Sequence, residues 1–149
     1  MQAIVETGMD TVTGALARNT PASSKQLWLG RVLSGLAILF LAFDAVAKLL
    51  ELPMVIEGTR RVGYPPSVVF GLGLVLLACV LAYAIPRTAI VGAILLTGYL
   101  GGAIATHVRI GDPLFSHTLF PIYVALVAWG GLYLRDRRLR AILPLVVRD

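Results

Sequence analysis

The chain has 149 residues, of which 58% are apolar and only 14% are charged, and its mean hydropathy is +0.85. A soluble domain of this length could not bury so much apolar surface, because its ratio of surface to volume is too high. The apolar surface that cannot be buried must face lipid. The net charge of +5 does not indicate nucleic-acid binding, because the basic residues lie at the ends of apolar runs and form no patch with interleaved aromatic residues.

Three regions are expected along the chain. Residues 1–26 are interpreted as a mobile cytoplasmic leader, 27–144 as a membrane domain and 145–149 as a cytoplasmic tail. The leader lacks the compact apolar segment and the small-residue cleavage site of a removable signal peptide.

The membrane domain contains four apolar runs, each close to the roughly 20 residues that cross about 30 Å of hydrocarbon. Strands are a poor alternative, because open sheet edges are not tolerated in lipid and the runs show no alternation. The sequence therefore predicts an all-α fold, an integral membrane four-helix bundle. The four predicted spans cover about residues 27–50, 67–85, 88–110 and 114–134.

The connections between the runs set which helices are neighbours. A tight turn is expected at Pro86 and another at 111–113. The linker 51–66 is the only long one, and its three prolines predict an extended or part-helical cap outside the bilayer.

Lysine and arginine placement predicts that both termini are cytoplasmic, since basic residues are enriched on that side of a membrane. With the N-terminus inside, nine basic residues fall on the inner side and at most four on the outer side. The inner nine are Arg18, Lys25, Arg31, Arg87, Arg135, Arg137, Arg138, Arg140 and Arg148, and the outer four are Lys48, Arg60, Arg61 and Arg109. Four aromatic residues are expected at the inner interface: Trp28, Tyr83, Trp129 and Tyr133.

Polar residues inside the first span share one helix face. Asp44 and Lys48 are four residues apart and can form an ion pair. The same face continues inward through Ala37, Ser34 and Gly30, a stripe of small residues that favours close packing against another helix.

The third span also carries polar residues on one face, where Tyr99 and His107 are separated by two helical turns. Stripes of small residues flank this face, and they predict close approach to neighbouring helices on both sides. The stripes are Gly98, Gly102 and Thr106 on one side and Thr97, Gly101 and Ala105 on the other.

These residues converge near the outer ends of the helices, together with His117 at the start of the fourth span. Ionisable groups cost roughly 2.5–3.5 kcal/mol to insert at mid-helix, so they tend to be functional. The alternative is an ion pair that only fixes helix register. A cavity with apolar walls would favour a ligand site. The candidate ligand-binding residues are Asp44, Lys48, Tyr99, His107 and Arg109.

Catalytic and metal motifs are absent from the sequence. Two histidines without HExxH or ExxH spacing give no specific metal signal. The single cysteine, Cys79, excludes an intramolecular disulfide and a CxxC redox pair, and it is interpreted as a lipid-facing or packing residue.

Four stretches together resemble the DoxX-like family of small four-helix bacterial membrane proteins. They are "FDAVAKLL", "RRVGYPPSVV", "YAIPRTAIVGAILLTGYLGGAIATHVRIGDP" and "WGGLYLRDRRLRAILP", and the likeness covers about residues 28–144. Residues at the family's motif positions are Lys48, Gly63, Tyr64, Pro65, Pro86, Arg87, Thr88, Gly101, Gly102, His107 and Arg109. One departure is Leu76, which stands where many relatives carry a glutamate.

The resemblance implies a bacterial inner-membrane location and leaves three functions open. The first is an interaction or assembly subunit of a membrane complex, which would bind lipid and either another membrane protein or a second copy of itself. The second is a quinone-linked redox subunit with quinone near Asp44 and His107, because the family's namesake is a subunit of a thiosulfate:quinone oxidoreductase. The third is a small oligomeric transporter. Quinone is the only candidate cofactor, and a fold resemblance by itself does not establish function.

The predicted orientation can be tested by labelling introduced cysteines in a Cys79→Ala background. A membrane-impermeant maleimide added to intact cells should label Ile110→Cys, which is expected outside, and should leave Arg137→Cys unlabelled until the cells are broken. Labelling of Arg137→Cys alone in intact cells would reverse the orientation.

Overall fold

The computed structural model describes residues 23–143, so most of the predicted leader and all of the predicted tail lie outside the described residues. The described chain is helical, and it contains four helices that are long and apolar enough to cross a membrane. They are α2 (Ser24–Leu49), α4 (Val69–Ala84), α5 (Ala89–Arg109) and α6 (Phe120–Arg135), with η1 (Pro66–Val68) leading into α4 and η2 (Leu114–Thr118) leading toward α6. The all-α membrane bundle predicted from the sequence is confirmed.

The helix ends follow from local sequence. Helix α2 begins before its apolar run because Ser23 and Gln26 form a capping box, in which each side chain accepts from the other residue's backbone N–H. Helix α4 ends at Ala84 because Ile85 precedes Pro86 and adopts an extended conformation. The Thr88 hydroxyl then donates to the Ala82 carbonyl at 2.8 Å and ties the turn together.

The linker between the first two spans is part-helical, as predicted. Helix α3 (Pro53–Arg61) begins with a proline at its first position, where no backbone N–H is required. It is followed by Gly63 with φ of 85°, a left-handed conformation that glycine adopts without strain. A short helix, α7 (Arg137–Ile142), follows α6 and is capped by the Asp136 side chain.

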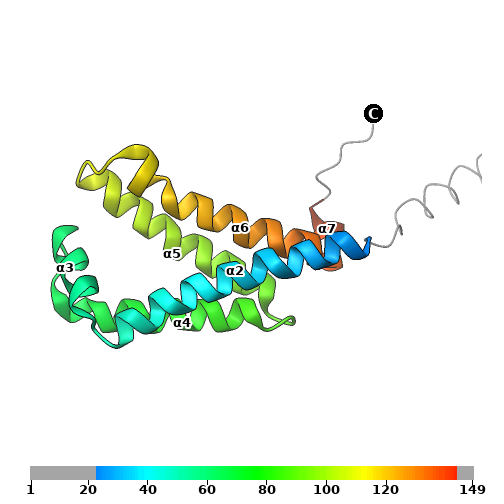
Figure 1. The fold of residues 1–149 in the computed structure, drawn as a ribbon, viewed down its shortest axis with the longest axis horizontal. Coiled ribbons are helices and arrows are strands. Elements are labelled where there is room, and N and C mark those ends of the chain that lie inside the picture. The colour runs from blue at the N-terminus through cyan, green and yellow to red at the C-terminus, as the bar shows by residue number, and fades with distance from the viewer. Residues whose placement is uncertain (1–22, 144–149) are drawn as a thin grey trace, which may run out of the picture.

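The four spans form a closed ring in which α2 packs against α4 and α6, and α5 packs against the same two helices. The α5–α6 pair and the α2–α4 pair diverge toward the end of the bundle that carries α3 and η2 (Figure 1). We call this the α3 end. The pairs converge at the opposite end, which carries α7 and the α4–α5 turn, and which we call the α7 end.

Glycines hold the helices together at the α7 end. A Cβ added at Gly30 of α2 would lie 2.9 Å from the Gly131 carbonyl oxygen of α6, and one added at Gly131 would lie 2.6 Å from the Ser34 nitrogen. A Cβ at Gly92 of α5 would lie 2.2 Å from the Tyr83 nitrogen of α4. The predicted small-residue face of the first span is thus a close helix contact, because backbones approach this closely only where side chains are small.

Tyr83, one of the aromatic residues expected at the inner interface, faces the inside of the bundle. Its side chain is 0% exposed, its hydroxyl donates to the Ala128 carbonyl at 2.7 Å, and the same oxygen lies 3.0 Å from the Ser34 hydroxyl. The prediction placed Tyr83 at the interface because it lies one residue from the end of α4. The packing of α4 turns it inward instead, and its hydroxyl finds partners on two other helices, as a buried tyrosine requires.

The outer surface of the bundle is apolar. Large apolar side chains remain exposed along the spans, among them Trp28, Leu39, Phe43, Leu74 and Leu126. Since a soluble monomer does not expose an apolar surface of this extent, these side chains face lipid. Cys79 is buried, which supports the packing interpretation over the lipid-facing one.

The Gly92 contact gives a stability prediction with a matched control on the same helix. Gly92→Ala should lower the thermal unfolding temperature in detergent, because overpacking against backbone costs about 1–3 kcal/mol or more. Gly98→Ala should leave the unfolding temperature unchanged or raise it, since a Cβ there meets nothing within 4 Å and alanine favours helix. Circular dichroism of both variants would measure this, and equal unfolding temperatures would contradict the packing described.

Candidate functional site

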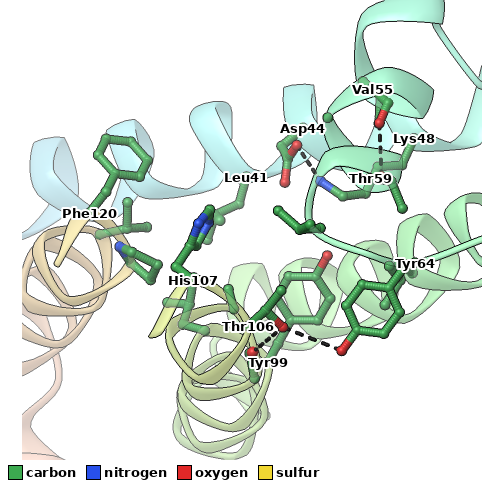
Figure 2. Close-up of a pocket in the computed structure, with 18 of the residues that line it drawn as sticks. Leu41, Asp44, Lys48, Val55, Thr59, Tyr64, Tyr99, Thr106, His107 and Phe120 are labelled. Carbon is green, nitrogen blue, oxygen red and sulfur yellow. Dashed lines mark hydrogen bonds and ion pairs between the residues drawn. The ribbon is translucent and has the colours of Figure 1, made fainter. Parts of the chain in front are cut away.

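A cavity of about 650 Å³ lies between the diverging helices at the α3 end (Figure 2). Its walls come from α2, α5 and α6, with α3 and the segment that leads into α4 on the remaining sides. Most of the lining is apolar, including Phe40, Leu41, Leu72, Leu100, Phe120 and Val124. The rings of Phe40 and Phe120 meet edge to face with centroids 5.6 Å apart, and they bridge α2 and α6.

One wall carries the predicted ion pair. The Lys48 ammonium donates to an Asp44 carboxylate oxygen at 2.5 Å, and both residues line the cavity. The Lys48 stem packs where Gly73 of α4 has no side chain, since a Cβ at Gly73 would lie 2.8 Å from the Lys48 Cβ. Contact with α4 therefore holds Lys48 against the inner face of the bundle.

The opposite wall carries Tyr99 and His107 of α5. In Figure 2 the Tyr99 hydroxyl points toward Asp44 and Lys48, and the His107 ring lies toward Leu41 of α2. The two α5 residues are eight positions apart, or about 12 Å along a helix. The polar groups thus extend along the cavity and do not form one compact cluster.

Within residues 23–143, three polar atoms on residues that line this cavity have no hydrogen-bond partner. They are the Tyr99 hydroxyl, the second carboxylate oxygen of Asp44 and the Nε2 atom of His107. Asp44 and His107 do not bond to each other; His107 Nδ1 instead lies 2.6 Å from Asp112 Oδ2. The ion pair is a contact within α2, so these groups do not lock helices to one another across the bundle.

Arg109 has a different place from the one predicted. It does not line the cavity. Its guanidinium donates to the Val62 carbonyl at 2.6 Å, and its central carbon lies 5.5 Å from the centre of the Tyr64 ring. The backbone conformation at Gly63, with φ of 85°, favours glycine, and a Cβ there would lie 3.1 Å from this guanidinium.

The segment held by Arg109 covers the cavity. The Tyr64 hydroxyl lies 3.3 Å from the Thr106 hydroxyl of α5. Thr59 of α3 is buried, lines the cavity and donates to the Val55 carbonyl. Arg109 therefore acts on the site by fixing its cover.

The small-residue stripes of the third span do not make the predicted close contacts. A Cβ at Gly98, Gly101 or Gly102 would meet nothing within 4 Å. Gly98 and Gly102 line the cavity, while Gly101 faces a second, shallower groove between α5 and α6. The close contact of α5 is made by Gly92 instead, one turn from the start of the helix. Small residues permit close packing, and here the divergence of the helices leaves the space open.

Asp112 is the site residue that the candidate set omitted. Gly111 takes a φ of 70°, and the Asp112 N–H then donates to the His107 carbonyl, which folds the chain back onto the last turn of α5. This brings the Asp112 carboxylate to His107 and within 3.7 Å of Arg61 Nη2. The sequence signal was an Asp just after a glycine at the end of a span, which helix periodicity does not register.

His117 lies close to this pair without joining the cavity wall. Its ring centroid is 6.0 Å from that of His107, and its Nδ1 lies 2.8 Å from the Ser116 hydroxyl. Among the described residues, no three His, Cys, Asp or Glu side chains gather as metal ligands would.

The fold and cavity define a class of four-helix integral membrane protein whose helices diverge around a mostly apolar cavity with a few polar side chains at one end of the bundle. The sequence profile of the DoxX-like family matches residues 32–131, and the chain belongs to this family. No curated protein and no solved structure shows a significant match to the chain.

Acidification should destabilise the protein through Asp112. The side-chain hydrogen bond with His107 holds the pKa of Asp112 below its ordinary value of 3.8, partly offset by desolvation, and nearby positive charge at Arg61 lowers the pKa further. A carboxyl group whose pKa is lowered by folding contributes stability at higher pH, and this contribution is lost as the pH falls through the folded pKa.

The unfolding temperature of the wild type should therefore fall more steeply than that of Asp112→Asn below about pH 5. Glu57→Gln removes an exposed carboxyl group of α3 and should keep the wild-type slope. Thermal unfolding in detergent at several pH values measures this, and identical slopes for wild type and Asp112→Asn would refute it.

Proposed function

We propose that this protein binds a lipid-soluble small molecule with an uncharged polar head group in the cavity at the α3 end. The observation that carries the proposal is the set of polar atoms without partners, on Asp44, Tyr99 and His107, that face one apolar-walled space. These atoms are free to form hydrogen bonds with a bound molecule. A ligand head group would supply those bonds, and the aromatic and aliphatic walls would accept its apolar part.

The charge of the cavity favours an uncharged head group. Lys48 and Asp44 form an ion pair, so their charges compensate, and the Arg109 guanidinium is engaged at Val62 outside the cavity. The volume of about 650 Å³ lies within the range of about 300–1,000 Å³ typical of small-molecule sites. It accommodates a substituted ring and the first part of a hydrocarbon tail.

A quinone is the candidate ligand. Its carbonyl oxygens can accept hydrogen bonds from Lys48 and from the Tyr99 hydroxyl, while its ring packs on Phe40 and Leu72. Besides the proposed quinone, the described residues provide no redox group. We therefore infer an accessory subunit that holds quinone for a partner protein. The distribution of basic residues supports a site near the outer face of a bacterial inner membrane, with both termini in the cytoplasm.

Assembly with another membrane protein, or with a second copy, is the second candidate. A shallow groove of about 290 Å³ between α5 and α6 is lined by Gly101, Ile104, Ile122, Leu126 and Trp129 among others. A Cβ at Gly101 meets nothing within the chain, so a helix of another protein could approach there closely, as small residues allow in membranes.

Two neighbouring glycines separate these functions. Gly102→Leu places a side chain in the cavity, and Gly101→Leu places one in the outer groove; both positions have room for the new Cβ. Decylubiquinone should raise the unfolding temperature of the wild type and of Gly101→Leu. At a free concentration about 100 times the Kd, the stabilisation should be about 2.7 kcal/mol. Gly102→Leu should show no such increase.

Thermal shift in detergent measures binding, and crosslinking in membranes measures assembly. Loss of crosslinked species in Gly101→Leu, with Gly102→Leu unaffected, would support the second candidate. Equal thermal shifts in all three proteins, or no shift in any, would overturn the proposed quinone site.

A further inference from the structure

The hydrogen bond between His107 and Asp112 decides which ring nitrogen of His107 carries the proton. Asp112 lies outside the membrane-spanning helices, and its side chain is only 9% exposed. Its carboxylate is held ionised by His107 and by nearby positive charge. An ionised carboxylate can only accept hydrogen bonds. The short contact of 2.6 Å therefore requires Nδ1 of His107 to be the donor.

The second nitrogen of His107 is then an acceptor. In a neutral imidazole one nitrogen donates and the other accepts, and the partner of the first fixes the role of the second. The Nε2 atom has no partner among residues 23–143, and His107 lines the cavity. The ring places its two nitrogens on different edges, so Nε2 is directed away from Asp112.

The charged and titratable groups around His107 come from several elements. Asp112 and His117 lie on the segment after α5, and Arg61 of α3 approaches the Asp112 carboxylate. The Asp44–Lys48 pair lies on the facing α2 wall, and Tyr99 lies on α5 itself. Of these, only Asp112 makes a hydrogen bond to the His107 ring within the described residues.

We propose that Asp112 is a positioning residue that fixes His107 in the tautomer with the proton on Nδ1, so that the cavity selects ligands whose head group carries a hydroxyl donor. The ligand class is phenolic, which includes hydroquinones. This proposal deepens the proposed ligand site and depends on it. It assigns the two walls different roles: His107 accepts a hydrogen bond from the ligand hydroxyl, and Lys48 and Tyr99 donate to a second ligand oxygen.

The first test needs no ligand. The protein has two histidines, so His117→Gln leaves His107 as the only imidazole. Nitrogen NMR of this variant with labelled histidine, at mildly alkaline pH, should place the ring proton on Nδ1. Adding Asp112→Asn should move the proton to Nε2, because the asparagine amide can donate to Nδ1. A proton on Nε2 with Asp112 intact would overturn the inference.

The second test measures ligand selection with para-nonylphenol and its methyl ether, which differ only in the hydroxyl donor. The wild type should bind the phenol about tenfold more tightly, because the ether leaves His107 Nε2 unpaired. Asp112→Asn should lose this preference. In this variant Nδ1 of His107 accepts a hydrogen bond from the asparagine amide, and Nε2 carries the proton. The ring then offers the cavity a donor and no longer an acceptor for the ligand hydroxyl. Thermal-shift titration in detergent gives the two affinities.

Arg61→Gln is the matched control. It removes the contact of 3.7 Å to the same carboxylate and leaves the bond to His107 in place, so it should retain the phenol preference. A preference that persists in Asp112→Asn would overturn the role of Asp112 while leaving the cavity as a binding site. Failure of the phenol, the ether and decylubiquinone to bind would overturn the proposed function as well.

Discussion

The close backbone contact at the α7 end constrains the rest of the molecule. Gly30 and Gly131 allow α2 and α6 to meet, and Gly92 allows α5 and α4 to meet, where no Cβ could be accommodated, and Tyr83 fills the centre with its hydroxyl bonded to α6. At the α3 end, the rings of Phe40 and Phe120 meet edge to face between α2 and α6. Helices are stiff over these lengths, so contact at one end and bulky side chains at the other produce a wedge-shaped space. The cavity is a consequence of this packing.

Polar residues in the cavity are informative because lipid provides no water to satisfy them. Inserting ionisable side chains into a membrane costs free energy. A purely structural role would offset this cost only if these side chains formed bonds between different helices. Here Asp44 bonds within its own helix, and His107 bonds to a residue five positions later. Leu76 of α4 is fully buried in the apolar core. The ionisable groups Asp44, Lys48 and His107 lie on α2 and α5 and line the cavity.

Helix periodicity in the sequence accounts for the placement of four candidate residues at the cavity, and it does not account for the places of Arg109 and Asp112. Asp44, Lys48, Tyr99 and His107 all line the cavity, and spacing along a helix indicates from sequence which of them share a face. Arg109 is the last residue of α5, and Asp112 follows at the turn where the chain leaves helical geometry at Gly111 and periodicity no longer applies. The glycines of α5 were expected to make contacts, but a small residue indicates only that close approach is permitted.

The sequence by itself determined the four spans, their helical form and the faces that carry polar groups, since these depend on local hydropathy, proline and glycine positions and helical period. Only the tertiary structure decided that Tyr83 turns inward, that Arg109 holds the cover in place, and that Asp112 meets His107. These outcomes depend on how the helices cross and on loop conformation. Both bring together atoms from different segments of the chain, and the helical period predicts neighbours only within one helix.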